Sequence, residues 1–129
     1  MKSTIKTFFL SFLLLTLSFQ LNAQDEPTID LTEISASKKY GQKPKTAIKV
    51  GTVANEYKYL AQLSGPNGEV IEYKRISSCC EFDCPSCPIG LGLLDKWEIK
   101  YPGLKKPIII YLNGYQYDDP KAPKSLGLK

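Results

Sequence analysis

The stretch "DKWEIKY", residues 95–101, decides the fold class because its apolar and charged residues alternate. Trp97, Ile99 and Tyr101 would share one face of an extended strand, and the charged side chains between them would share the other. Such alternation is typical of an antiparallel strand that buries one face and exposes the other. The stretch therefore predicts a sheet that packs one face against a core.

The segments around this stretch predict further strands. "EVIEYKRIS" (69–77) also alternates, and "TAIKVGTV" (46–53) is rich in the β-branched residues that favour strands. "IIIYLNGYQY" (108–117) is apolar on both faces, so we expect it to be a central strand. A weaker alternation in "TIDLTEI" (28–34) allows one short strand. We therefore expect a mainly antiparallel sheet of about four strands.

A single segment has the helical period. In "NEYKYLAQLSG" (55–65), apolar or small residues recur three and four positions apart. Asn55 can cap the start, and Gly65 followed by Pro66 would end the helix. One short helix packed on a small, mainly antiparallel sheet is an α+β fold.

The N-terminus predicts export. Residues 1–23 have a basic head with Lys2 and Lys6, an apolar run, and Ala23 at the end of a short polar segment, which is typical of a signal peptide. The apolar run is shorter than the roughly 20 residues of a membrane span, so an uncleaved anchor is the less favoured alternative. Cleavage after Ala23 would leave residues 24–129 in the periplasm, on the cell surface or outside the cell, with no stable membrane span.

The exported part is expected to form one domain, because a chain of 106 residues builds a single core. Residues 24–46 are polar and broken by prolines and a glycine, which indicates an extended N-terminal arm. The predicted strands and helix place the α+β domain at 47–118. Residues 119–129 have no period and are expected to form an irregular C-terminal tail.

All four cysteines lie in "SSCCEFDCPSCPIGLG" (77–92). Cysteines of exported proteins usually form disulfides. A bond between Cys79 and Cys80 would close a very small, strained ring, so bonds from these two to Cys84 and Cys87 are favoured, in either order. Each would contribute roughly 2–3 kcal/mol and staple the connection between two strands.

Two other uses of the cysteines are weaker. Cys84 and Cys87 have the Cys-x-x-Cys spacing of thiol–disulfide exchange proteins, but the preceding Asp83 would raise the pKa of a thiol and no helical pattern follows. Four thiolates could bind zinc, but the adjacent Cys79 and Cys80 fit a tetrahedral site poorly. We therefore expect no metal.

The sequence favours a non-catalytic role, with an enzyme as the rival class. It contains no histidine, which removes the commonest general base and the Ser-His-Asp and Cys-His pairs. It has no phosphate loop or dinucleotide fingerprint, so no cofactor is indicated, and no concentrated basic patch for nucleic acid. Four glutamates are expected on solvent faces of their elements: Glu56, Glu69, Glu72 and Glu98.

One group of side chains has the chemistry of a binding surface. Tyrosines near the ends of the predicted strands, with an asparagine among them, could contact carbohydrate or protein at the cell envelope. The alternative, which we favour, is that they are core and sheet-face residues. The group consists of Tyr101, Tyr111, Asn113, Tyr115 and Tyr117.

Several segments resemble a group of small exported proteins of Gram-negative bacteria. They are "IKVG" (48–51), "GPNGE" (65–69), "SCCEF" (78–82), "GLLDKWEIKYPGL" (92–104) and "KPIIIYLNGYQYD" (106–118). The group typically shows a Cys-Cys-x-Phe, a Gly-Leu-Leu-Asp-x-Tyr-Glu and a Leu-Tyr-x-Asn-x-Tyr pattern. The resemblance implies a lineage and no settled activity.

The chain departs from this pattern at Cys84 and Cys87, and it has Trp97 where the group has tyrosine. The resemblance implies that the adjacent Cys79 and Cys80 are the group's own feature, which leaves a vicinal disulfide open. Proteins of the group often carry the label 2-dehydro-3-deoxyphosphooctonate aldolase. The enzyme of that name resembles a TIM barrel, which needs about 200–250 residues, so we do not expect that activity here.

Overall fold

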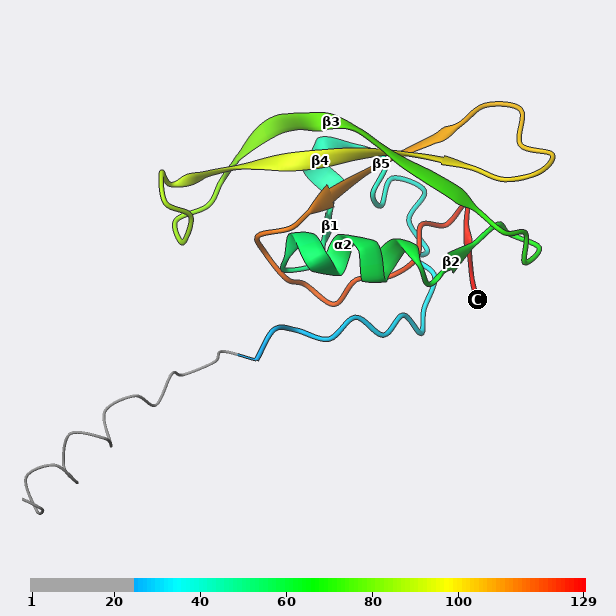
Figure 1. Ribbon diagram of the computed structural model, residues 1–129, viewed down its shortest axis with the longest axis horizontal. Coiled ribbons are helices and arrows are strands. Elements are labelled where there is room, and N and C mark those ends of the chain that lie inside the picture. Colours follow the sequence, from blue (N-terminus) through cyan, green and yellow to red (C-terminus); the bar gives the residue numbers. More distant parts are fainter. Residues whose placement is uncertain (1–24) are drawn as a thin grey trace, which may run out of the picture.

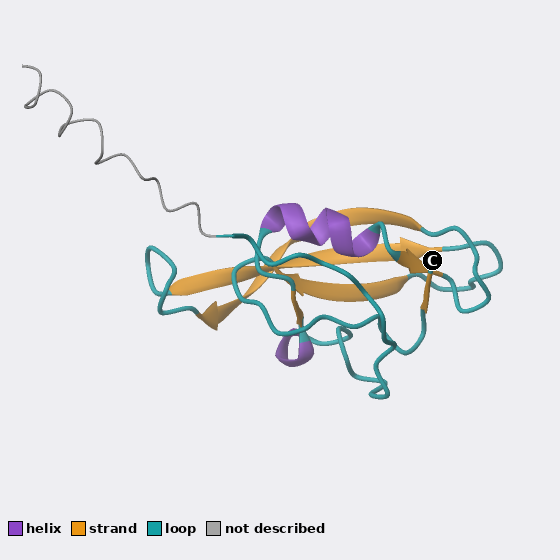
Figure 2. Ribbon diagram, turned by 90° about the horizontal axis from the view of Figure 1, so that it is seen from below, coloured by secondary structure: helices purple, strands orange, loops and turns teal. Residues whose placement is uncertain are grey.

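The computed structural model describes residues 25–129, so the predicted signal peptide (1–23) lies outside the described residues. The chain forms an α+β fold, as predicted (Figure 1). Helix α2 (Val53–Leu60) covers one face of a four-stranded sheet. The short 3-10 helix η1 (Pro44–Thr46) lies on the other face (Figure 2).

The four-stranded sheet has the order β1-β5-β4-β3. Strand β5 (Ile108–Asn113) is central, as predicted, and pairs antiparallel with β4 (Leu91–Lys100). Strand β4 pairs antiparallel with the edge strand β3 (Glu72–Asp83). Strand β1 (Ile48–Lys49) pairs parallel with β5 and is shorter than predicted, because η1 ends just before it and α2 begins just after it.

Helix α2 begins earlier than predicted. Thr52, not Asn55, is the N-cap, and its hydroxyl accepts a hydrogen bond from the Asn55 amide at 3.1 Å. The Asn55 side chain is buried and donates to the backbone oxygens of Val50 and Pro27. The helix ends at Leu60 rather than near Gly65, because the next residues form strand β2 (Leu63–Ser64).

Strands β3 and β4 form a long hairpin that extends past the N-terminal end of α2 (Figure 1). The predicted strand 69–77 starts at Glu72 and continues through the first two cysteines to Asp83. Its pairing with β4 shifts register twice, between Arg75 and Ser77 and between Cys79 and Glu81. Each shift leaves one β3 residue without a partner, as in a β-bulge.

The arm and the tail both contribute to the core. Ile29 and Leu31 are buried, but the expected strand at 28–34 forms only an isolated bridge between Ile34 and Ala122. The tail, expected to be irregular, ends in β6 (Gly127–Leu128), which pairs with β2. The core between α2 and the sheet is completed by fully buried side chains: Ile48, Tyr59, Leu60, Ile99, Ile110 and Leu112.

Candidate functional site

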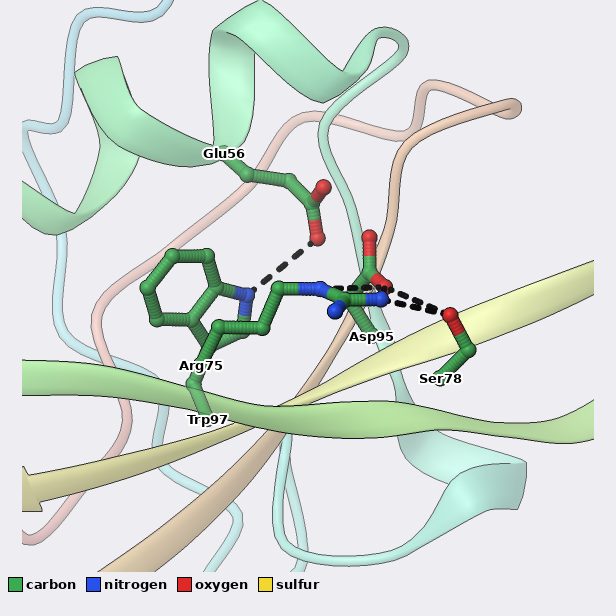
Figure 3. Close-up of polar contacts among 5 residues, drawn as sticks. All are labelled: Glu56, Arg75, Ser78, Asp95 and Trp97. Carbon is green, nitrogen blue, oxygen red and sulfur yellow. Dashed lines mark hydrogen bonds and ion pairs between the residues drawn. The ribbon is translucent and has the colours of Figure 1, made fainter.

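A cluster of polar side chains lies between α2 and the β3–β4 hairpin (Figure 3). Glu56 points from the helix towards the sheet, where it meets Trp97 and Asp95 of β4 and Arg75 of β3. Ser78 of β3 lies at the outer end. The cluster thus links the helix to the sheet through polar and charged side chains, beside the apolar core.

Glu56 is the most unusual member, because it is an acid with 1% of its surface exposed. Its Oε1 accepts a hydrogen bond from Trp97 Nε1 at 3.4 Å, and Oε2 has no hydrogen-bond partner among the described residues. Burial raises the pKa of Glu56 to about 8, and the neighbouring Asp95 carboxyl adds to the rise. Glu56 is therefore mostly protonated and neutral at pH 7.

Asp95 forms the ion pair of the cluster. Its Oδ1 accepts hydrogen bonds from Arg75 Nη2 at 2.7 Å and from Arg75 Nε at 3.1 Å. Arg75 also donates to Ser78 Oγ, and its side chain is 44% exposed. The pKa of Arg75 is raised by its hydrogen bond to Asp95. The cluster thus runs from a neutral, enclosed acid to an ion pair that faces solvent.

The placement of Glu56 corrects the sequence analysis, which put this residue on a solvent face. Asn55, Glu56, Tyr59 and Leu60 are the buried residues of α2, at spacings of three and four. Glu56 therefore lies on the apolar face of the helix, and its spacing from Tyr59 and Leu60 was the available signal. Because the side chain is enclosed, a substrate cannot reach its carboxyl group. We therefore assign the cluster a structural role, in which it holds α2 against the sheet.

The cysteines form disulfides, but the favoured pairing was wrong. Cys79 bonds to Cys80, and Cys84 bonds to Cys87. In a regular strand, successive side chains point to opposite faces. The second register shift falls at this point, and Cys80 adopts a left-handed φ of 56°, which brings the two sulfurs to the same side. The vicinal pair is thus built by the β-bulge.

The two disulfides differ in exposure. Cys84 is fully buried and Cys87 is 9% exposed in the loop after β3, whereas Cys80 is exposed on the strand. The Cys84–Cys87 bond closes a turn in which the Cys87 amide donates to the Cys84 oxygen at 2.9 Å. Residues 25–129 contain no free cysteine and no group of three acidic or cysteine side chains that could hold a metal ion.

The predicted tyrosine set does not form one surface. Tyr101 follows β4 and packs against the core, while Tyr115 lies near the other end of β5, with its ring 6.0 Å from that of Phe82. Asn113 is buried, and its Oδ1 accepts from the amides of Tyr115 and Gln116. Tyr111 is half-buried in β5, and the exposed Tyr117 donates to Asp119.

Comparisons of the chain with family models, with curated proteins and with solved structures give no match in any of the three. Within residues 25–129, no helix has the length and hydrophobicity needed to cross a bilayer.

Proposed function

We propose that the protein is exported and acts in the periplasm, on the cell surface or outside the cell as a small, non-catalytic binding domain. The observation that carries this proposal is that every cysteine of the chain is paired in one of two disulfides. Such bonds persist in oxidising compartments and are rare in the cytosol. The basic and apolar pattern of residues 1–23 supports the same location.

A binding role is better supported than catalysis. The chain has no histidine, and its most strongly perturbed acid, Glu56, is enclosed beneath the helix. Meanwhile the far end of the β3–β4 hairpin exposes large apolar side chains, among them Leu91, Leu93 and Ile89. Exposed apolar side chains of this kind favour contact with a partner, which we propose is carbohydrate or protein of the cell envelope.

Thiol–disulfide exchange is the weaker alternative. A disulfide that exchanges must be reached by an attacking thiolate, and Cys84 is fully buried. The aldolase label is supported least. The described domain is a four-stranded, mainly antiparallel sheet, which differs from an eight-stranded parallel barrel. The resemblance to small exported bacterial proteins remains a proposal about lineage.

Export and disulfide formation are tested together by intact mass. The full chain is expressed in a Gram-negative bacterium, recovered from the cell fractions and the medium, and alkylated with and without prior reduction. We expect the mass of residues 24–129, no alkylation without reductant and four alkylated cysteines after reduction. A Cys84→Ser/Cys87→Ser variant serves as the control, with two alkylated cysteines after reduction. Retention of Met1 together with four thiols that react without reductant would overturn the proposal.

A further inference from the structure

The far end of the β3–β4 hairpin has a side that faces the same way as the core but lies beyond α2 (Figure 1). Trp97 of β4 contacts Glu56 of the helix, so its side chain points towards α2. Side chains of a strand alternate between the two faces of a sheet, so Leu93 and Leu91 point the same way as Trp97. We call the surface that they form the inner face.

Strand β3 supplies the acidic part of the inner face. In the register of the hairpin, Glu81 lies opposite Leu93 and Asp83 lies opposite Leu91. Residues directly opposite each other in an antiparallel pair share a face, so both acidic side chains lie beside the leucines. Both are exposed, and neither forms an ion pair with another of the described residues. The inner face thus has an apolar row on β4 and an acidic row on β3.

A third apolar side chain borders this surface. Val53 is the first residue of α2 and is exposed. A Cβ atom on Gly114, directly after β5, would lie 3.2 Å from Val53 Cγ2. Because β5 is the neighbour of β4 in the sheet, Val53 lies at the boundary between the helix and the apolar row.

The end of the hairpin is held in place without a partner. The Cys84 amide donates to the Gly90 oxygen at 2.9 Å, and the Cys84–Cys87 disulfide closes the loop beside this bond. Gln116 Nε2 donates to the backbone oxygen of Asp83 at 3.3 Å, which ties the end of β3 to the segment after β5. A surface that is ordered in advance loses less conformational entropy on binding.

The layer above the inner face has no cover from the described part of the chain. Helix α2 has 8 residues and is therefore about 12 Å long, whereas the 12 residues of β3 span about 40 Å. Residues 25–129 contain no second α-helix that could cover the rest of the hairpin. Because an apolar sheet face is usually buried by another element, we infer that the cover comes from a partner.

We propose that the inner face binds a basic amphipathic helix of a protein of the cell envelope. Apolar side chains of this helix would pack on Leu91 and Leu93, and lysine or arginine side chains beside them would contact Glu81 and Asp83. The spacing fits, because two residues of a row are about 6.7 Å apart along a strand, and helical residues four apart are separated by about 6 Å. The inference rests on the binding role proposed above and specifies the chemistry of the partner.

Charge argues against other occupants. The acidic row would be repelled by the anionic headgroups of a lipid surface. A second copy of the chain offers no suitable helix among its described residues, because α2 buries its own apolar face and has Lys58 as its single basic residue. A basic helix is the occupant that matches both rows.

The test uses the isotope-labelled, disulfide-bonded protein and a designed helical peptide of 14 residues, followed by amide NMR. The peptide is acetylated and amidated, and it carries a leucine stripe beside a lysine stripe in an alanine background, which favours the helix. A second peptide has glutamate in place of every lysine, and a third has the composition of the first in scrambled order. We expect the first to shift the amides of Glu81, Leu91 and Leu93. The other two should bind at least about fivefold more weakly, because each exposed ion pair contributes about two- to fivefold.

Variants assign each row to its contact. Glu81→Gln/Asp83→Asn should bring the lysine and glutamate peptides close to equal affinity, whereas Leu91→Ser/Leu93→Ser should remove detectable binding of both. Glu72→Gln is the matched control, because Glu72 is exposed on the other face of β3, and it should bind the lysine peptide as the wild type does. Unchanged amide shifts in the core show that each variant is folded.

Absence of shifts with saturating lysine peptide would overturn the inference, and so would equal affinity of the wild type for the lysine and glutamate peptides. Shifts of the inner-face amides with protein concentration alone would assign the surface to a second copy, and shifts with phosphatidylglycerol vesicles would assign it to a lipid surface; either would also overturn it. All these results leave the processed, disulfide-bonded mass unaffected. A failure of this site is therefore distinguishable from a failure of the proposed function.

Discussion

The two halves of the β3–β4 hairpin are stabilised differently. In the near half, Glu72–Ser78 lies opposite Asp95–Lys100, and this half packs against α2, with Trp97 and Ile99 buried. In the far half, Cys79–Asp83 lies opposite Leu91–Leu94 and extends beyond the helix. Both disulfides lie in or beside this far half.

The difference shows how a small domain can hold a strand pair that its core does not cover. Burial of apolar surface stabilises the near half, at roughly 25 cal/mol per Å² removed from water. Leu91 is 40% exposed and Leu93 is 46% exposed, so the far half gains little from burial on this face. In the far half, the two disulfides provide stabilisation that burial of apolar surface provides in the near half.

The largest effect should come from Trp97→Ala in the near half. Trp97 is 3% exposed and contacts Tyr57 and Tyr73 edge-on, with ring centroids 5.4 and 6.1 Å away. We expect its removal to lower the free energy of unfolding by about 3–5 kcal/mol. Urea denaturation followed by circular dichroism measures this loss. Ile89→Ala, at a residue 82% exposed in the loop between β3 and β4, should change stability by less than about 0.5 kcal/mol.

The next effect is a pH dependence set by Glu56. Its ordinary pKa is 4.5 and its folded pKa is about 8, so between these values the unfolded chain loses the proton while the folded chain keeps it. This group's contribution to stability is therefore full below pH 4.5 and is lost as pH rises through 8. Glu56→Gln should match wild type at the low end and exceed it by roughly 4 kcal/mol at pH 8.

Denaturation curves collected across this pH range measure that difference. Glu72→Gln is the matched control, because it makes the same substitution at an exposed position of β3. A Glu56→Gln variant whose difference from wild type stays constant from acid to alkaline pH would contradict the assignment of a neutral Glu56.

In the far half, loss of the buried disulfide should have an intermediate effect. Cys84→Ser/Cys87→Ser opens a four-residue loop, which costs about 2 kcal/mol by the entropy of loop closure. Hydrogen exchange should show faster exchange of the Cys87 and Gly90 amides, which donate within the loop, with the near-half amides unchanged. Equal acceleration in both halves would show that the halves are not independently stabilised.

The smallest effect should come from Cys79→Ser/Cys80→Ser. The vicinal bond closes the shortest ring, so its entropic contribution is about 1 kcal/mol. Urea denaturation of the two double variants side by side ranks the disulfides. If the vicinal variant loses more stability than the Cys84→Ser/Cys87→Ser variant, the far half depends on the bulge rather than on the loop.

The sequence predicted what depends on local pattern. The alternation around Trp97 identified β4 and its buried face, and the two apolar faces of 108–113 identified the central strand. The helix was found but its start was displaced, because Thr52 and Asn55 are both good capping residues. Only the packed structure shows which of them precedes the first helical turn.

The sequence did not predict features that depend on tertiary contacts. The vicinal disulfide requires a register shift at Cys79 and Cys80, and such a shift is set by pairing with β4 rather than by the local sequence. Glu56 was assigned to solvent from its charge, although its spacing placed it on the apolar face. The inner face depends on strand pairing in the same way, because the register of the hairpin brings Glu81 of β3 beside Leu93 of β4.

The interrupted register of β3 also affects how molecules meet at high concentration. Its outer edge carries backbone groups that another chain could pair with, which is how ordered fibrils begin. The two shifts divide that edge into short regular segments. An incoming strand could therefore form backbone hydrogen bonds over only a few residues before its register no longer matched. The irregular strand thus offers a second copy of the protein only short stretches for such pairing.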